Sequence, residues 1–161
     1  LGATTPSFDL ETEVDATYPI DHITRQLAEE TLQKFVGSIE QIPPAFSAVK
    51  IDGQRAYKMA RKGQTPELKA KTLVIDEIEL LDFAPDRLTL RIVCSKGTYI
   101  RALARDIGEA LGSGAHLTAL RRTRVGEFTI DRCMSVDEAT AFIRDVDITM
   151  PEEASDKLQP Q

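Results

Sequence analysis

The stretch Cys94-Ser95-Lys96-Gly97-Thr98-Tyr99-Ile100-Arg101 decides the fold. Residues 87–94 before it read as a strand, and Gly97 supplies a turn. From Tyr99 to Leu111 the apolar residues recur with helical period, so an aromatic hydroxyl and an arginine stand at the start of a helix. Such an arrangement could hold a nucleobase beside a catalytic carboxylate.

A second face of this predicted helix combines positive charge with missing side chains. Arg101, Arg105, Gly108 and Gly112 follow one another at three- and four-residue steps. Glycines at this spacing allow another backbone or a ligand to approach closely, and a helix N-terminus offers free N–H groups to an anion. We therefore expect an anion or a polar base to be favoured near residues 96–98.

Two strands, residues 73–83 and 87–94, are separated by Ala84-Pro85-Asp86 and predicted to pair antiparallel. Earlier in the chain, a helix is expected from a cap at Asp21 to a stop at Gly37. The fold class is thus α/β (α+β), a mixed and largely antiparallel sheet with flanking helices. No internal repeat and no linker interrupt the chain, which favours one domain over residues 1–150.

Shorter elements complete the prediction. Residues 47–51 alternate like a strand, Asp52-Gly53 is a hairpin signal, and residues 55–62 can close as a short helix. Ser135 and Glu138 form a capping box that opens a last helix, ending near Arg144. The charged tail, residues 151–161, is expected to be disordered.

Composition limits the class of protein. Of 161 residues, 42% are hydrophobic, yet no apolar run approaches the roughly 20 residues that cross a bilayer. The two cysteines form no disulfide framework, which fits a reducing compartment, and we expect a cytoplasmic protein. His22 and His116 lack the spacing of metal ligands, so no metal is expected. No cofactor is expected either.

The charge is segregated along the chain. The net charge is −6, but residues 47–72 and 91–125 each hold seven basic and two acidic residues, a net +5 per segment. Such segregation indicates one basic surface that binds phosphates on an otherwise acidic body. The alternative is that these runs are solvated faces. A protruding basic turn is the best candidate for entering an RNA groove, and its members are Arg55, Lys58, Arg61 and Lys62.

Several segments, in order, resemble the pseudouridine synthases of the TruB family, which isomerise uridine-55 in the T loop of tRNA. Gly2, Thr5 and Asp9 match that family's G-x-x-T-x-T/S-x-D stretch, and residues 42–50 (IPPAFSAVK) match its P-P-x-Y/F-S-A-x-K segment. Further matches are Gly53, Tyr57, Ala60, Arg61, Gly63, residues 95–101, 106–108, 114–117 and 120–122. The resemblance implies a pseudouridine synthase catalytic-domain fold.

The resemblance also implies roles for individual residues. Tyr99 would stack on the flipped target base and remove the C5 proton, and Arg101 would pair with the family's catalytic aspartate. Leu120 would line the base pocket, while Lys50 and Pro44 would lie close to the active site. Substrate contacts are also expected for Lys96, Arg61, Arg121 and Arg122. A phenol offers a π face, and a guanidinium keeps a carboxylate ionised and oriented.

One family motif is missing. The catalytic aspartate lies in a G-x-L-D-P-x-A-T-G segment that has no match in these residues. We therefore expect a C-terminal portion of the catalytic domain, truncated at the N-terminus, without a PUA domain and inactive by itself. Asp9 belongs to another matched stretch, and Asp106 belongs to the helix, so neither is assigned the catalytic role.

The expected partner is the tRNA T-arm stem-loop, with no membrane and no protein partner required. Two other functions remain open from the sequence. One is a guide-RNA-dependent, dyskerin-like synthase, and the other is a non-catalytic RNA-binding or RNA-chaperone module. The aspartate's role, as nucleophile at C1′ or as base, also stays open.

Overall fold

The structure is a computed structural model that describes residues 1–47, 50–51, 54–60, 62 and 68–145. The chain divides into two compact units, residues 1–119 and 120–161, and each is described by itself. The unit boundary falls inside residues 1–150, and their assignment to one domain stays a prediction. The expected tail, 151–161, lies outside the described residues.

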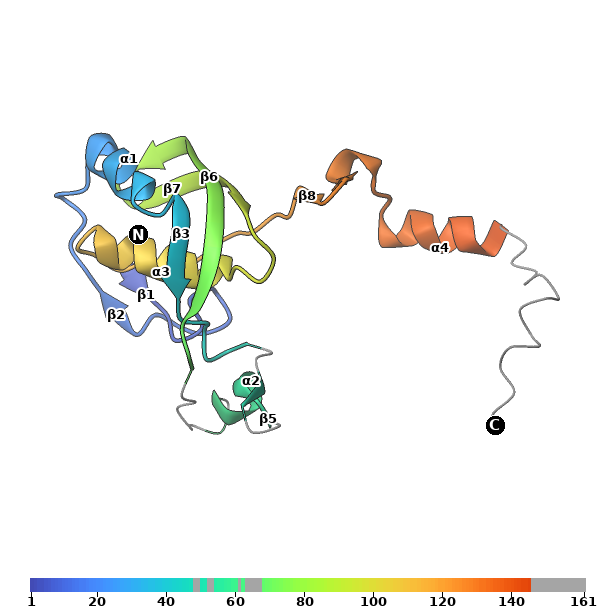
Figure 1. Ribbon diagram of the computed structural model, residues 1–161, viewed down its shortest axis with the longest axis horizontal. Coiled ribbons are helices and arrows are strands. Elements are labelled where there is room, and N and C mark those ends of the chain that lie inside the picture. Colours follow the sequence, from blue (N-terminus) through green and yellow to red (C-terminus); the bar gives the residue numbers. More distant parts are fainter. Residues whose placement is uncertain (48–49, 52–53, 61, 63–67, 146–161) are drawn as a thin grey trace. The chain divides into compact units, whose positions relative to one another are not determined.

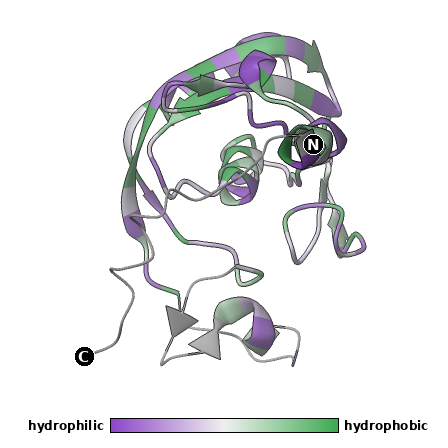
Figure 2. Cartoon of the chain, turned by 90° about the vertical axis from the view of Figure 1, so that its right-hand side faces the viewer, coloured by the Kyte–Doolittle hydropathy of each residue, from purple (hydrophilic) through white to green (hydrophobic). Residues whose placement is uncertain are grey.

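A three-stranded antiparallel sheet is the centre of the first unit (Figure 1). Its strands are β3 (Gly37–Gln41), β6 (Lys71–Ala84) and β7 (Arg87–Cys94), in the order β3-β6-β7. The predicted pairing of the two long strands is confirmed, with Ile78 opposite Ile92. Along β7 exposed and half-buried residues alternate at first, and Figure 2 shows hydrophobic and hydrophilic segments alternating along the sheet.

Two helices bury their apolar residues against this sheet. Helix α1 (Arg25–Gln33) contributes Leu32, α3 (Ile100–Ala110) contributes Leu103 and Ile107, and β6 contributes Ile75 and Ile78. Each such side chain stabilises the fold by about 1.5–3 kcal/mol when fully buried. The predicted helix after the glycine turn is confirmed, and its apolar stripe is the one that faces the core.

The predicted start and end of the first helix were wrong. Thr24, and not Asp21, is the N-cap, because its hydroxyl accepts a hydrogen bond from the Leu27 N–H at 3.1 Å. The helix ends at Gln33, and Lys34 is its C-cap. Gly37 begins β3 with φ of 101°, a left-handed conformation that suits glycine.

The first unit also contains two short antiparallel strand pairs. Antiparallel pairs join β1 (Ala3–Thr4) to β2 (Ala16–Thr17) and β4 (Lys50–Ile51) to β5 (Gln54–Arg55). The second pair confirms the predicted hairpin, although its turn residues, 52–53, lie outside the described residues. Helix α2 (Ala56–Ala60) follows and is shorter than predicted.

Gly108, in α3, allows the close approach that the sequence predicted. A Cβ on Gly108 would lie 2.5 Å from the backbone nitrogen of Ala115, so the segment after the helix packs directly on it. Gly112 lies just past the helix end with φ of 67°, and its N–H donates to the Glu109 carbonyl at 2.9 Å. This packing brings residues 114–117 back toward the N-terminal strand.

The second unit contains β8 (Arg124–Val125), β9 (Phe128–Thr129), a 3₁₀ turn η1 (Ile130–Arg132) and α4 (Val136–Asp145). The predicted capping box is confirmed: Glu138 accepts from the Ser135 N–H at 2.7 Å, and Ser135 Oγ accepts from the Glu138 N–H at 3.2 Å. In the part of the chain that the structure describes, no helix has both the length and the apolar character needed to cross a membrane.

Candidate active site

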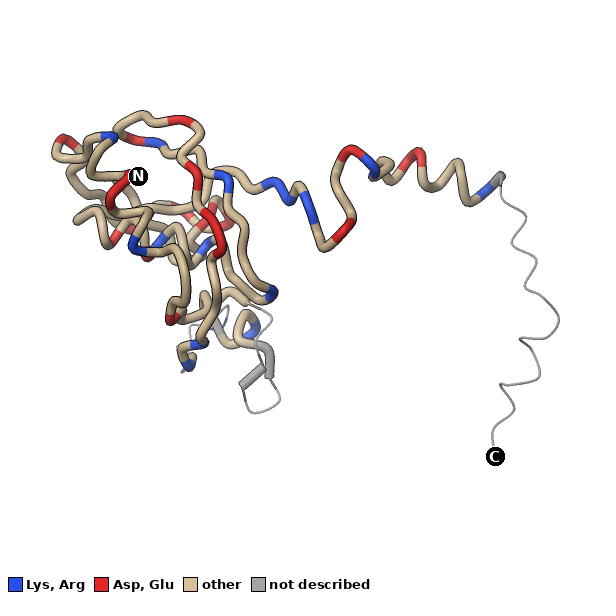
Figure 3. The backbone as a smooth tube through the Cα atoms, turned by 45° about the horizontal axis from the view of Figure 1, so that its top comes forward, with Lys and Arg blue, Asp and Glu red and all other residues tan. Residues whose placement is uncertain are grey.

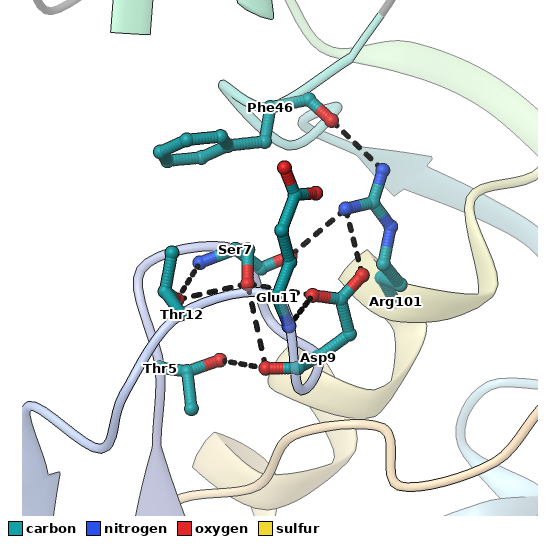
Figure 4. A network of polar contacts seen from close by, with 7 residues as sticks. All are labelled: Thr5, Ser7, Asp9, Glu11, Thr12, Phe46 and Arg101. Atoms are coloured by element: carbon teal, nitrogen blue, oxygen red, sulfur yellow. Dashed lines mark hydrogen bonds and ion pairs between the residues drawn. The ribbon is translucent and has the colours of Figure 1, made fainter. Parts of the chain in front are cut away.

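Arg101, in the first turn of α3, is the centre of a polar network (Figure 4). Its Nη1 donates to Asp9 Oδ2 at 3.0 Å and to the Ser7 carbonyl at 3.2 Å, and its Nη2 donates to the Phe46 carbonyl at 2.8 Å. Its Nε–H and one Nη2–H have no partner among the described residues. The guanidinium is therefore fixed on two sides, with donors left for a further acceptor.

Hydrogen bonds from its own loop also restrain the Asp9 carboxylate. Its Oδ1 accepts from the Ser7 hydroxyl at 2.6 Å and from the Glu11 N–H at 2.9 Å. Burial raises the pKa of Asp9, but the hydrogen bonds from Ser7 and Glu11 and the charge of Arg101 outweigh it, so this pKa lies below its ordinary value. With 25% of the Asp9 side chain exposed and 22% of Arg101, this is a mostly buried ion pair.

Tyr99 is the residue just before α3, and its backbone is fixed by the strand beside it. The Gln41 side chain accepts from the Tyr99 N–H at 2.9 Å and donates to the Tyr99 carbonyl at 3.2 Å. Gln41 is the last residue of β3 and only 1% exposed. The end of the strand thereby sets the position at which Tyr99 enters the helix, two residues before Arg101.

The turn before Tyr99 has the conformation that the glycine predicts. Gly97 has φ of 93°, and Thr98 donates its hydroxyl to the Ser95 carbonyl at 2.9 Å. Ser95 is tied to β6, because its N–H donates to the Val74 carbonyl and its Oγ accepts from the Val74 N–H. Lys96 is exposed in this turn, and its predicted contact with substrate stays a prediction.

Other predicted site residues divide into three groups. Pro44 is fully buried, two residues before the Phe46 carbonyl that binds Arg101. Lys50 begins β4, but its side chain lies outside the described residues, as does all of Arg61. Their predicted contacts with substrate therefore stay predictions.

Three further predicted residues belong to the second unit. Leu120, Arg121 and Arg122 are all exposed there. Together with Arg124, the two arginines form a short basic run on the chain, seen as blue positions in Figure 3. An exposed leucine beside exposed arginines is compatible with contact to a base and to phosphates, and these roles too stay predictions.

Both histidines have structural partners. His116 Nδ1 lies 3.0 Å from the Ala3 carbonyl, and His22 Nε2 lies 2.8 Å from the Leu111 carbonyl. Among the described residues, no group of three or more His, Cys, Asp or Glu side chains could hold a metal ion.

Reasoning from the sequence alone did not find that Asp9 restrains Arg101 or that Gln41 restrains Tyr99. The resemblance implied that Arg101 pairs with an aspartate outside this chain, whereas within the described residues its carboxylate partner is Asp9. The signal for Asp9 was its place in the G-x-x-T-x-T/S-x-D stretch, which lies far from the glycine turn in the sequence. Gln41 carried a weaker signal, as a polar residue directly before the Ile42-Pro43-Pro44 segment.

Comparison with known proteins identifies the family to which this chain belongs. The family described as TruB family pseudouridylate synthase (N terminal domain) matches residues 1–100, and the tRNA pseudouridylate synthase B C-terminal domain matches residues 101–158. The chain therefore belongs to the TruB family of pseudouridylate synthases.

Individual relatives agree with this assignment. The tRNA pseudouridine synthase B of Phocaeicola vulgatus is 70% identical over 137 residues, which are 85% of this chain and 58% of the relative. That of Parabacteroides distasonis is 63% identical over 153 residues, 95% of this chain and 65% of the relative. The chain thus spans about three fifths of the length of these curated relatives.

A solved structure supports the predicted fold class. A chain in the crystal structure of a Cbf5-Nop10-Gar1 complex superposes with a TM-score of 0.53 and 35% sequence identity. The match covers 68% of this chain and 28% of that chain. The prediction of a mixed α/β fold with an antiparallel sheet and flanking helices is confirmed.

Proposed function

We propose that residues 1–161 form part of a tRNA pseudouridine synthase that isomerises uridine-55 in the T loop. The observation that carries the proposal is the position of the Arg101 guanidinium. Arg101 lies two residues after Tyr99, and its guanidinium is fixed by Asp9 and by the Phe46 carbonyl. Family membership supplies the reaction class. The geometry supplies an aromatic hydroxyl and a cation at neighbouring positions of one helix start.

The isomerisation needs the target base to be turned out of its stack before any bond changes. The C1′–N1 glycosidic bond then breaks, the base turns, the C1′–C5 bond forms, and the proton at C5 leaves while N1 gains one. Tyr99 offers a π face for the extruded uracil and a phenolic oxygen for the C5 proton. Its backbone, fixed by Gln41, restricts where the ring can lie.

Arg101 can bind a second carboxylate in addition to Asp9. Asp9 and the two carbonyls restrain the guanidinium, while Nε–H and one Nη2–H lack partners among the described residues. A carboxylate bound by those donors would stay ionised and directed at the sugar. We assign that carboxylate to the family motif absent from residues 1–161, and we assign to Asp9 the orientation of Arg101.

Substrate contacts complete the proposal. The cations assigned to phosphates of the T arm are Lys96, at the exposed turn, Arg61, and, in the second unit, Arg121 and Arg122. Lys50 is assigned a place close to the active site. In the first unit, Pro44 is assigned to the wall of the base pocket. In the second unit, described by itself, the exposed Leu120 is assigned a contact with a base. Binding that depends on such cations weakens steeply with salt, so the logarithm of the affinity should fall linearly with the logarithm of the salt concentration.

Pseudouridine formation in a T-arm stem-loop, followed by tritium release from C5 of labelled uridine, tests the proposal. We compare the protein in its full natural length with residues 1–161 alone, and with Tyr99→Phe. Removal of the hydroxyl should lower the rate by about 10²-fold or more, as for other proton-transfer groups. Tyr18→Phe is the matched control, because Tyr18 is exposed and outside the network.

Three results would change the proposal. Turnover by residues 1–161 alone would show that the missing motif is dispensable and would make Asp9 the candidate catalytic carboxylate. Hairpin binding without turnover by the full-length protein would favour the non-catalytic RNA module. Turnover only after addition of guide RNA would favour the guide-dependent synthase.

A further inference from the structure

A second arginine lies one helical turn after Arg101, outside the residues assigned to the reaction. Arg105 shares a face of α3 with Arg101 because the two are four residues apart. Its side chain is only 18% exposed, and its guanidinium has partners on three sides. Its Nε donates to Asp106 Oδ1 at 2.7 Å, its Nη2 donates to the Ile42 carbonyl at 3.2 Å, and Cζ lies 4.9 Å from the centroid of the Phe8 ring.

Phe8 has an unfavourable backbone conformation directly beside Asp9. Its φ is 62°, and it is the one non-glycine residue with positive φ in the described part of the chain. An aromatic residue adopts this left-handed conformation only where its surroundings hold it. Its backbone is tied by the Phe8 N–H to the Thr5 carbonyl at 3.0 Å and by the Leu117 N–H to the Phe8 carbonyl at 2.9 Å. Arg105 holds its ring by a cation–π contact.

The Ile42 carbonyl, which accepts from Arg105, belongs to the same segment as the Phe46 carbonyl that accepts from Arg101. Ile42 begins the segment in which Phe46, four residues later, offers its carbonyl to Arg101. Two prolines, Pro43 and Pro44, stiffen the chain between these carbonyls. Arg105 therefore contacts the same two segments as Arg101. It contacts residues 7–9 through the Phe8 ring and residues 42–46 through the Ile42 carbonyl.

Arg105 is poorly placed to bind a phosphate itself. The shallow hollow beside it, of about 350 Å³, is also lined by the carboxylates Glu40, Asp106 and Glu109. Three carboxylates around one guanidinium disfavour a polyanion. Burial raises the pKa of Asp106 even with Arg105 beside it, which agrees with a partly desolvated pair rather than a solvent-facing cation.

We propose that Arg105 is a positioning residue for the isomerisation: by holding the Phe8 ring and the Ile42 carbonyl, it keeps Asp9 and the Phe46 carbonyl in place around Arg101. The effect on turnover rests on the proposed function above. The effect on the geometry of Phe8 and Asp9 does not, and the two are measured separately.

Steady-state kinetics on the T-arm stem-loop, with the full-length protein, test the first part. Arg105→Met keeps the apolar stem and removes the guanidinium, and we expect kcat to fall about tenfold with KM changed less than about twofold. Arg105→Lys retains a cation over the ring and should recover part of kcat. Arg25→Met, which removes an exposed ion pair on α1, is the control. A kcat within twofold of wild type for Arg105→Met, or a rise in KM alone, would overturn the proposal.

A double-mutant cycle identifies the path of the effect. Asn tolerates the left-handed conformation, so Phe8→Asn removes the ring without demanding a new backbone. If Arg105 acts through Phe8, Arg105→Met should lose most of its effect on kcat in the Phe8→Asn protein, whereas fully additive effects would contradict this path.

Amide hydrogen exchange tests the geometry without any turnover. The Leu117 N–H donates to Phe8 and the Glu11 N–H donates to Asp9, so both should exchange about tenfold faster in Arg105→Met. The amide of Ile78, in the middle of β6, should be unchanged. Unchanged exchange at Leu117 and Glu11 would refute the positioning role whatever the activity. Absence of turnover in the wild type would refute the proposed function instead, while the exchange data still decide the role of Arg105.

Discussion

Replacement of Gln41 by Met should destabilise the protein, because Gln41 joins β3 to the start of α3. Its amide makes two hydrogen bonds to the Tyr99 backbone and is 1% exposed. Methionine has similar length but neither donates nor accepts these bonds. Leaving a buried partner unsatisfied costs about 1–3 kcal/mol, and the added apolar burial offsets about 1 kcal/mol.

The Tyr99 carbonyl still accepts from the Leu103 N–H, so only the Tyr99 N–H is left unsatisfied, at about 2 kcal/mol, and the second bond lost counts about 1 kcal/mol more. After the offset from apolar burial, the unfolding free energy falls by about 2 kcal/mol. Urea denaturation followed by circular dichroism would show a midpoint lower by about 1 M, for an m-value of about 2 kcal/mol/M. Gln26→Met on α1 makes the same chemical change where the amide bonds an exposed Glu30, and it should alter stability by less than about 0.5 kcal/mol. Equal stability of Gln41→Met and wild type would refute the claim that this amide fixes Tyr99.

Three further predictions follow from close contacts elsewhere. Gly108→Ala should destabilise the protein by about 1–3 kcal/mol in urea denaturation, although alanine normally favours a helix, because its Cβ would meet the Ala115 nitrogen at 2.5 Å. The pKa of Asp9 is lower in the folded state than in the unfolded state. The extra stability of wild type over Asp9→Asn should therefore be present above the ordinary pKa of 3.8 and should disappear as the pH falls through the folded-state pKa. Measurement of the unfolding free energy of both proteins from pH 2 to 6 would show it. Ser135→Ala removes the cap of α4, and loss of about 1 kcal/mol should reduce the helical Cα chemical shifts of residues 136–145.

Local patterns predicted those elements whose determinants lie within a few residues. The capping box at Ser135 and Glu138 needs only a three-residue spacing, and the Gly97 turn needs only one glycine. The long strands were predictable because each is a run of eight or more residues rich in branched apolar side chains, and the two runs are separated by a short proline-containing turn. The start of the first helix was not, since Asp21 and Thr24 both cap well by composition, and the choice depended on the Leu27 N–H reaching the threonine.

The site itself depends on contacts that no local pattern contains. Arg101 and Asp9 are 92 residues apart, and Gln41 and Tyr99 are 58 residues apart, so each pair exists only after the sheet and α3 have packed. A resemblance to a family can identify Tyr99 and Arg101 one at a time, but it says nothing of what restrains them. Restraint requires a folded core, because a carboxylate, a strand-end amide and a carbonyl each reach the start of α3 from a different segment. We therefore expect substitutions of residues such as Gln41 and Arg105 to disturb Tyr99 and Arg101 through the fold, without any contact to substrate.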